Sequence, residues 1–372
     1  MELFKTGDWN LKTNKIAFQD TNKPVKNKNK NKKNKNKNKS KSNSNLEQKT
    51  TKDDSTNNNN DEVKDVERSK SKKEKKITKP TLNLQPAKKL TPLQQKMMAK
   101  LSGSRFRWIN EQLYTISSKE ALNLIKDQPE LFDEYHDGFR SQVTSWPENP
   151  VDVFTTQIIA RCKRPINAPG GLPGLQNSKE IVIADMGCGE AQLALKINQF
   201  FSKFNKGKKP FKRYNHKVHS FDLKRVNERI TVADIRNVPL PDNSCTIVIF
   251  CLSLMGTNFL DFIKEAYRIL APRGELWIAE IKSRFGDGKG DEFVESLKLM
   301  GFFHKKTDDE NKMFTRFEFF KPPQDIIEER KAKLERRQKF IEVESAKEEL
   351  ERKRHDNAEG NWLLKPCIYK RR

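Results

Sequence analysis

The chain has 372 residues, of which 34% are hydrophobic and 33% are charged, and its formal net charge is +24. That length allows one large core with appendages or two modest domains, and the charge points to a polyanionic partner, either nucleic acid or an anionic membrane. The longest apolar run, residues 246–256, is too short to span a bilayer, and the first ten residues lack the apolar segment of a signal peptide, so we expect a protein that is neither secreted nor inserted in a membrane.

The first predicted segment, residues 1–89, is rich in Lys and Asn. Residues 1–90 carry 25 Lys and Arg against 11 Asp and Glu, so more than half of the net charge lies there. The run KNKNKNKKNKNKNKSKSNSN has no apolar residue and cannot offset the entropy of ordering its backbone. We expect a disordered tail that binds RNA through counterion release and acts as a nuclear or nucleolar address. A solubilising linker without a target is the alternative.

Residues 90–165 have the apolar periodicity of helices and form a predicted helical subdomain. Four helices are predicted, over residues 90–115, 117–128, 129–146 and 149–163. The first should break or bend near Gly103. The second begins with a capping box made by Ser117 and Glu120, and the fourth has Asn149 as its N-cap.

The next predicted segment, residues 166–321, alternates short apolar runs with amphipathic ones. Strands are predicted over residues 181–185, 217–222, 229–234, 246–254 and 274–281, with two closing strands over 302–307 and 313–320. Helices are predicted over residues 191–204, 258–271 and 291–301. Short apolar strands joined by helical crossovers indicate an α/β fold with a parallel sheet covered on both faces. The remaining segment, residues 322–372, reads as one charge-laced helix followed by a separate tail, WLLKPCIYKRR.

A glycine turn follows the first predicted strand, in the stretch IVIADMGCGEAQLALK. The dinucleotide fingerprint G-x-G-x-x-G/A needs a third small residue, and Gln192 stands in its place. The next acid that ends a strand, Asp222, comes 35 residues after Gly187, well beyond the spacing of about 20 typical of NAD sites. The pattern instead fits the acid-x-Gly-x-Gly-x-Gly turn of S-adenosylmethionine-dependent methyltransferases. Asp185, Gly187 and Gly189 match it, and Ala191, a common small replacement, stands in the place of the third glycine.

Acids also end the second and third predicted strands of this segment. In such a sheet, Asp222 is placed to accept hydrogen bonds from both ribose hydroxyls of the cofactor, although it could simply cap a helix. Asp234 is placed to meet the adenine amino group, and Ile235 could border the ring or belong to the core. Cys251 lies near the carboxyl end of the fourth strand, where ligands bind in open α/β sheets, but a cysteine taken alone is more often a buried small hydrophobic residue. The five scattered cysteines include no C-x-x-C pair, which argues against a zinc site or a disulfide framework.

Several stretches, taken together, resemble the ribosomal RNA-processing protein 8 family, most closely its fungal members. The stretches are EYHDGFRSQV, WPENPVD, VIADMGCGEAQLA, VHSFDL and VPLPDNSCTIVIFCLSLMGTNFLDFIKEAYRILAPRGELWIAEIKSRF. The resemblance covers the chain from about Leu90 onward. It implies a Rossmann-like class I S-adenosylmethionine-dependent methyltransferase fold with an N-terminal helical subdomain. It also implies a nucleolar enzyme that methylates N1 of an adenine in large-subunit ribosomal RNA, acting on pre-ribosomal particles without a membrane or a metal.

The resemblance further implies which residues contact the cofactor. Carried over by motif, they are His136, Gly187, Asp222, Asp234, Ile235 and Cys251. His136 would belong to a helical lid that reaches the methionine end of the cofactor, a role that its sequence context alone does not indicate. Position 235 is methionine in some relatives, which suggests a backbone contact there.

The expected chemistry needs no general base, so we name no catalytic base. The sulfonium methyl is already activated and adenine N1 has a free lone pair, so alignment and exclusion of water suffice. The loop SLMGTN replaces the Asn-Pro-Pro-Tyr-like loop of enzymes that methylate the exocyclic amine, which argues against N6 chemistry. Two other hypotheses stay open: a protein or small-molecule methyltransferase, and a non-catalytic nucleolar RNA- or chromatin-binding assembly factor.

Overall fold

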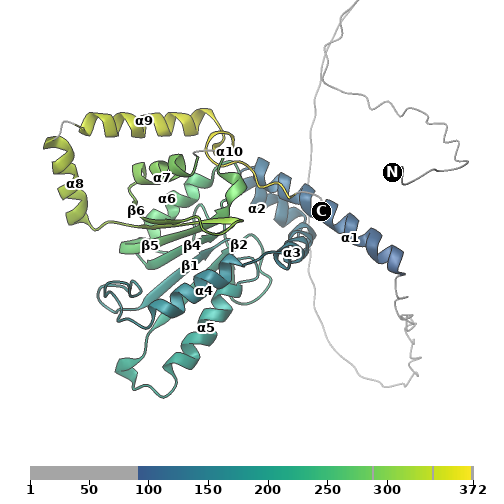
Figure 1. Ribbon diagram of the computed structural model, residues 1–372, viewed down its shortest axis with the longest axis horizontal. Helices are drawn as coiled ribbons and strands as arrows, with labels where there is room; N and C mark the ends of the chain where they lie inside the picture. The colour runs from purple at the N-terminus through teal and green to yellow at the C-terminus, as the bar shows by residue number, and fades with distance from the viewer. Residues whose placement is uncertain (1–90, 287–288, 337–338, 370–372) are drawn as a thin grey trace, which may run out of the picture. The chain divides into compact units, whose positions relative to one another are not determined.

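The computed structural model describes residues 91–286, 289–336 and 339–369 (Figure 1). The predicted disordered tail, residues 1–89, lies outside the described residues. Within the described ranges, no helix combines the length and the apolar character needed to cross a bilayer.

The helical subdomain begins with one uninterrupted helix, α1. Its first three helices are α1 (Pro92–Thr115), α2 (Ser118–Asp127) and α3 (Glu130–Val143). The break expected as one possibility near Gly103 is absent, since α1 continues through that residue. The capping box of Ser117 and Glu120 is confirmed at the start of α2. Helices α1 and α3 pack closely because Gly138 has no side chain: a Cβ atom there would lie 2.5 Å from the Cβ of Phe106.

Helix α4 (Pro150–Arg161) has Asn149 as N-cap, as predicted, but it packs on the sheet rather than on α1–α3. Its residues Phe154 and Ile158 lie one helical turn apart and are buried against the sheet with Trp277. The cluster that joins α1, α2 and α3 contains no residue of α4. Helices α1, α2 and α3 therefore form a cluster of their own.

Seven strands form one mixed sheet in the order β3-β2-β1-β4-β5-β7-β6. They are β1 (Ile181–Met186), β2 (His216–Asp222), β3 (Ile230–Val232), β4 (Cys245–Cys251), β5 (Leu270–Ile281), β6 (Phe303–Asp308) and β7 (Phe314–Phe320). Strands β1 to β5 are parallel to one another, and β7 pairs antiparallel with both β5 and β6. This order, with its helical crossovers, confirms the Rossmann-like fold class. The sequence predicted a parallel sheet, and that prediction is wrong for β7, which is antiparallel to both of its neighbours.

Helices cover both faces of the sheet. On one face, α4 and α5 (Gln192–Asn205) pack against β1 and β4. On the other, α6 (Phe259–Ile269) and α7 (Lys289–Leu299) pack over an apolar cluster that includes Phe250 and Leu276. Because both faces are buried, the central strands β1 and β4 carry almost unbroken apolar runs.

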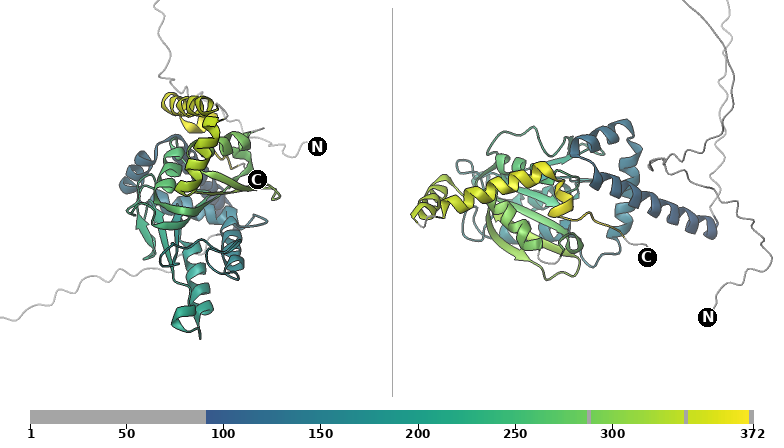
Figure 2. Two further views of the ribbon diagram at one scale, coloured as in Figure 1. Left: turned by 90° about the vertical axis from the view of Figure 1, so that its left-hand side faces the viewer. Right: turned by 90° about the horizontal axis from the view of Figure 1, so that it is seen from above.

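The C-terminal segment is not the single helix and separate tail that its sequence suggests. It forms α8 (Gln324–Arg336), α9 (Phe340–Asp356) and the short α10 (Glu359–Trp362) (Figure 2). Leu363 and Leu364, which follow α10, are 1% and 0% exposed and join the main core. Farther on, the carbonyl oxygen of Cys367 accepts a hydrogen bond of 2.8 Å from the buried amide of Asn110 in α1. The segment thus ties α1 to the sheet.

Candidate functional site

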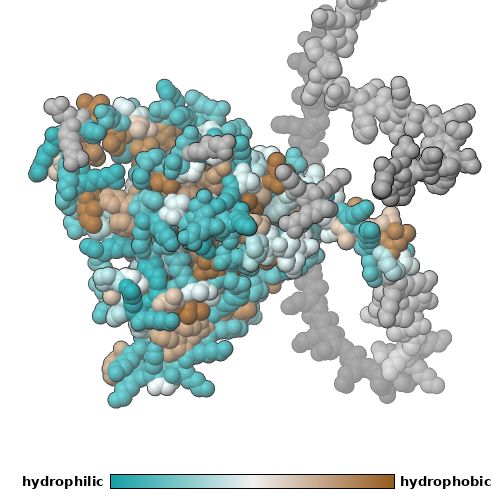
Figure 3. Space-filling view, viewed as in Figure 1, coloured by the Kyte–Doolittle hydropathy of each residue, from teal (hydrophilic) through white to brown (hydrophobic). Residues whose placement is uncertain are grey.

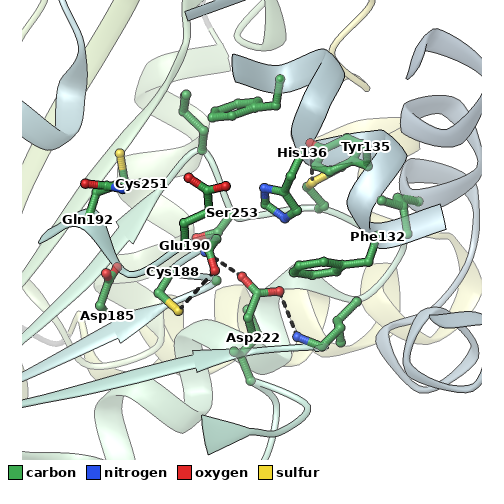
Figure 4. A pocket seen from close by; sticks show the side chains of 18 of the residues that line it. Phe132, Tyr135, His136, Asp185, Cys188, Glu190, Gln192, Asp222, Cys251 and Ser253 are labelled. Carbon is green, nitrogen blue, oxygen red and sulfur yellow. Dashed lines mark hydrogen bonds between the residues drawn. The ribbon is translucent and has the colours of Figure 1, made fainter. Parts of the chain in front are cut away.

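A cavity of about 500 Å³ lies at the carboxyl ends of β1, β2 and β4, under helices α2 and α3 (Figure 4). Its walls include all six residues that the family resemblance predicts: His136, Gly187, Asp222, Asp234, Ile235 and Cys251. They come from segments separated by up to 115 positions, and the shared direction of the parallel strands gathers them at one edge of the sheet.

The glycine turn forms the floor of this cavity. Gly187 has a φ of +76° and Gly189 a φ of +57°, both in the left-handed region that favours glycine. A Cβ atom on Gly187 would lie 2.5 Å from the Cβ of Ser253, in the loop after β4. The same loop is held to β1, since the Ser253 hydroxyl donates a hydrogen bond to the carbonyl oxygen of Met186. The turn therefore leaves bare backbone facing the cavity and has no room for a side chain at 187.

Asp222 closes the turn from the next strand. The parallel register places Met186 opposite Phe221, so Asp222, the last residue of β2, lies beside Gly187 at the start of the glycine turn. One carboxylate oxygen of Asp222 accepts the N–H of Gly189 at 2.6 Å, and the other accepts the N–H of Leu223 at 2.7 Å (Figure 4). Each oxygen keeps a further lone pair for a ligand. Burial raises the pKa of Asp222 to about 6, against the lowering effect of these two N–H groups.

A second carboxyl, Asp185, lies on the cavity wall one strand away. It is 3% exposed, and burial together with the nearby charge of Asp222 raises its pKa to about 7. Burial makes the ionised forms of these two carboxyls unfavourable. A cationic ligand would stabilise the two carboxylates, so the site favours such a ligand. This end of the cavity is therefore suited to a molecule that carries positive charge and hydroxyl groups.

Asp234 and Ile235 follow β3 and border the same cavity. The Asp234 carboxylate accepts a hydrogen bond of 3.0 Å from the hydroxyl of Ser118, the first residue of α2. The Ser118 N–H in turn donates to Asn258, in the loop that precedes α6, at 3.0 Å. The side chain of Ile235 is 9% exposed and belongs to the main apolar cluster, which fits a backbone contact rather than a side-chain one. Ser118 was not predicted, because nothing in its local sequence indicates a partner 116 positions away.

His136 reaches the glycine turn from α3. Its ring Cε1 would lie 3.1 Å from a Cβ atom on Gly189, and its ring centroid lies 4.3 Å from that of Phe132, with the two ring planes tilted by 45°. Burial, with a smaller contribution from Arg140, lowers its pKa to about 4, so the imidazole is neutral at pH 7. Arg140 also forms an ion pair with Glu190 in the turn itself, which fixes α3 over the cavity.

Cys251 ends β4 where the backbone turns sharply. The next residue, Leu252, has a φ of +59°, which is uncommon for a residue other than glycine. Its N–H donates a hydrogen bond of 2.9 Å to the carbonyl oxygen of Ala279. Leu254 N–H donates to the buried carboxylate of Glu280 at 3.0 Å. Burial raises the pKa of the Cys251 thiol well above its usual value, so the group acts as a small apolar wall and not as a thiolate. All five cysteines are free thiols.

Several cavity residues were not assigned to the site from the sequence. Besides Ser118 they are Phe132, Tyr135, Phe139, Ser253 and Met255. The α3 aromatics follow helical spacing, but that spacing is equally typical of a core helix. Within the described ranges no three His, Cys, Asp or Glu side chains gather in a geometry suited to a metal ion.

The chain is similar to proteins of known family over most of its length. A family model described as "Hypothetical methyltransferase" matches residues 92–340. The 25S rRNA (adenine(645)-N(1))-methyltransferase of Saccharomyces cerevisiae is 67% identical over 100% of both chains. The enzyme of the same printed name from Schizosaccharomyces pombe is 50% identical over 63% of this chain and 67% of its own. Ribosomal RNA-processing protein 8 of Dictyostelium discoideum is 41% identical over 76% of this chain and 61% of its own. These matches confirm the resemblance: the chain belongs to the ribosomal RNA-processing protein 8 family of methyltransferases.

Proposed function

We propose that this chain is an S-adenosylmethionine-dependent methyltransferase that methylates N1 of an adenine in large-subunit ribosomal RNA. The observation that carries the proposal is the 67% identity, over the whole of both chains, to a relative named for that reaction. The cavity supports it, because the six residues expected at the cofactor lie on its walls.

The cavity residues fit this cofactor group by group. The bare backbone at Gly187 lets the cofactor lie against the turn, and Asp222 has lone pairs for the two ribose hydroxyls. Asp234 would accept the adenine amino group while Ser118 holds its carboxylate in place. A neutral His136 avoids repelling a sulfonium, whereas an imidazolium would oppose it. When bound, the cofactor supplies an activated methyl group.

The residues around the cavity orient the reactants and exclude water. Phe132, Tyr135 and Phe139 form an apolar roof on α3. The Tyr135 hydroxyl contacts the sulfur of Met255 at 3.6 Å, which joins this roof to the loop after β4. Because adenine N1 carries its own lone pair, no residue of this chain has to remove a proton. N1 lies on the Watson–Crick edge, so the target adenine must be unpaired or extruded before it enters. With this substrate, the enzyme would act on pre-ribosomal particles in the nucleolus.

Cofactor affinity should depend on pH through Asp222. The carboxylate must be ionised to accept both ribose hydroxyls, and its pKa is raised to about 6. The dissociation constant for S-adenosylhomocysteine should therefore rise as pH falls, by about tenfold per pH unit below 6, because one proton competes with the ligand. Isothermal titration across this range measures it. The Asp222→Asn variant should show no such step below pH 6, and a step that persisted in that variant would assign the titration to another group.

Methyl transfer itself is tested with the full chain, labelled S-adenosylmethionine and unmodified large-subunit ribosomal RNA. A methyl on N1 blocks Watson–Crick pairing, so reverse transcription should stop at one adenine only when cofactor is present. Digestion of the product should release the label as 1-methyladenosine. Cofactor binding without a stop at any adenine would refute the substrate and leave a protein or small-molecule acceptor in its place.

A further inference from the structure

The N-terminal part of α1, residues 92–104, extends beyond the rest of the folded chain (Figures 1 and 2). We call these residues the α1 arm. Residues 92–102 are all exposed, and the arm is about 20 Å long at the rise of an α-helix. The same helix continues into buried Phe106 and Ile109 and reaches Leu113, which lines the cavity. The arm is thus a direct, helical continuation of the cavity wall.

One side of this helix is a basic ridge made by Lys96, Lys100 and Arg107. Their spacing of four and seven residues places them on one side, spread over about 16 Å. No Asp or Glu occurs between residues 91 and 110, and among the described residues none of the three takes part in an ion pair. Arg105 differs, because it pairs with Glu134 of α3 at 2.7 Å.

Beside the ridge runs an apolar stripe of Leu93, Met97, Leu101 and Trp108. Their exposed fractions are 68%, 63%, 65% and 45%, and Figure 3 shows apolar surface on the projecting part of α1. The stripe lies opposite the face that Phe106 and Leu113 bury. A contiguous apolar surface of this kind marks a binding face.

We propose that the ridge and the stripe of α1 bind the RNA that flanks the target adenine. The ridge contacts phosphates, and the stripe, with the Trp108 ring, contacts the faces of unpaired bases. A second copy of this chain is a poor partner for this surface. If two arms packed against each other, their basic ridges would lie close together and repel each other. That this RNA is ribosomal RNA rests on the proposed function. That α1 binds a polyanion rests only on its basic ridge and exposed apolar stripe.

Neutralising the ridge tests this assignment. In the full chain carrying Lys96→Gln, Lys100→Gln and Arg107→Gln, the slope of log affinity against log salt for a large-subunit rRNA transcript should fall by about 2, since each phosphate contact on single-stranded RNA contributes about 0.7. KM for that RNA should rise roughly tenfold at moderate salt. The dissociation constant for S-adenosylhomocysteine and kcat at saturating RNA should not change, because none of the three ridge residues lines the cavity.

A matched control is available at the far end of α5. That helix also starts at the cavity and ends about 20 Å away, where Lys203, Lys206 and Lys209 are exposed. Neutralising these three lysines removes the same charge at a similar distance. An equal rise in KM with both triple variants would mean that net charge alone matters, and would overturn the assignment.

The stripe is tested with Leu93→Ser, Met97→Ser and Leu101→Ser, which keeps all charge. Weaker RNA binding with an unchanged salt slope supports base contacts. RNA binding like that of the unmodified chain in both the ridge and stripe variants would overturn the proposal and favour a protein as the occupant of this face. Because these are binding measurements, they can be read even if no adenine is methylated, which separates failure of the arm from failure of the proposed function.

Discussion

Replacing Asp222 with alanine should weaken S-adenosylhomocysteine binding by at least about a hundredfold and abolish detectable methyl transfer. The variant removes two charge-assisted hydrogen bonds to the ligand, each worth about 1.5–3 kcal/mol, and also frees the N–H groups of Gly189 and Leu223 that shape the turn. The fold should survive, because burial already makes the ionised carboxylate costly. Calorimetric titration and a thermal melt measure the two effects.

The control for Asp222 is Glu228→Ala, which removes an exposed acid from the loop between β2 and β3. Its cofactor affinity and melting temperature should match those of the unmodified chain. Unchanged affinity in Asp222→Ala would place the ribose elsewhere and remove this residue from the site. A collapse of the fold in that variant would show instead that its hydrogen bonds to the turn are structural.

Replacing Gly187 with alanine should also eliminate cofactor binding, for a steric reason. A φ of +76° costs a non-glycine residue about 1–2 kcal/mol, and the new Cβ would lie 2.5 Å from the Cβ of Ser253. To relieve that overlap, the turn and the loop after β4 must separate, which displaces the backbone that faces the ligand. Titration with S-adenosylhomocysteine and urea unfolding report the two consequences.

Gly207 provides the matched control for Gly187. Its φ is +75°, nearly the same, but a Cβ atom there has no neighbour within 4 Å. Gly207→Ala should therefore show only the backbone cost and bind the cofactor normally. We expect Gly187→Ala to lose about 1–3 kcal/mol more of the free energy of unfolding, the usual range for overpacking. Equal losses in the two variants would rule out the predicted collision with Ser253.

Local patterns predicted the elements that surround the cavity. The alternation of apolar runs and amphipathic helices placed five strands and the glycine turn close to where they occur, because strand and helix periodicities are properties of neighbouring residues. Acids at strand ends, such as Asp222 and Asp234, could be assigned to one edge because parallel strands share their direction. His136 had no such signal, and only the family resemblance pointed to it.

Other features depend on contacts between residues far apart in the chain, which no local pattern encodes. The antiparallel strand β7 inserts between β5 and β6, α4 leaves the helical subdomain to cover the sheet, and Leu363 and Leu364 join the main core instead of forming a tail. Ser118 lies against Asp234 only because α2 folds over the strand ends. Burial is a property of the assembled core, and it is the largest cause of the raised pKa of Asp222 and of the lowered pKa of His136. The sequence thus predicted the residue types of the site, whereas their proximity and their protonation states depend on the tertiary structure.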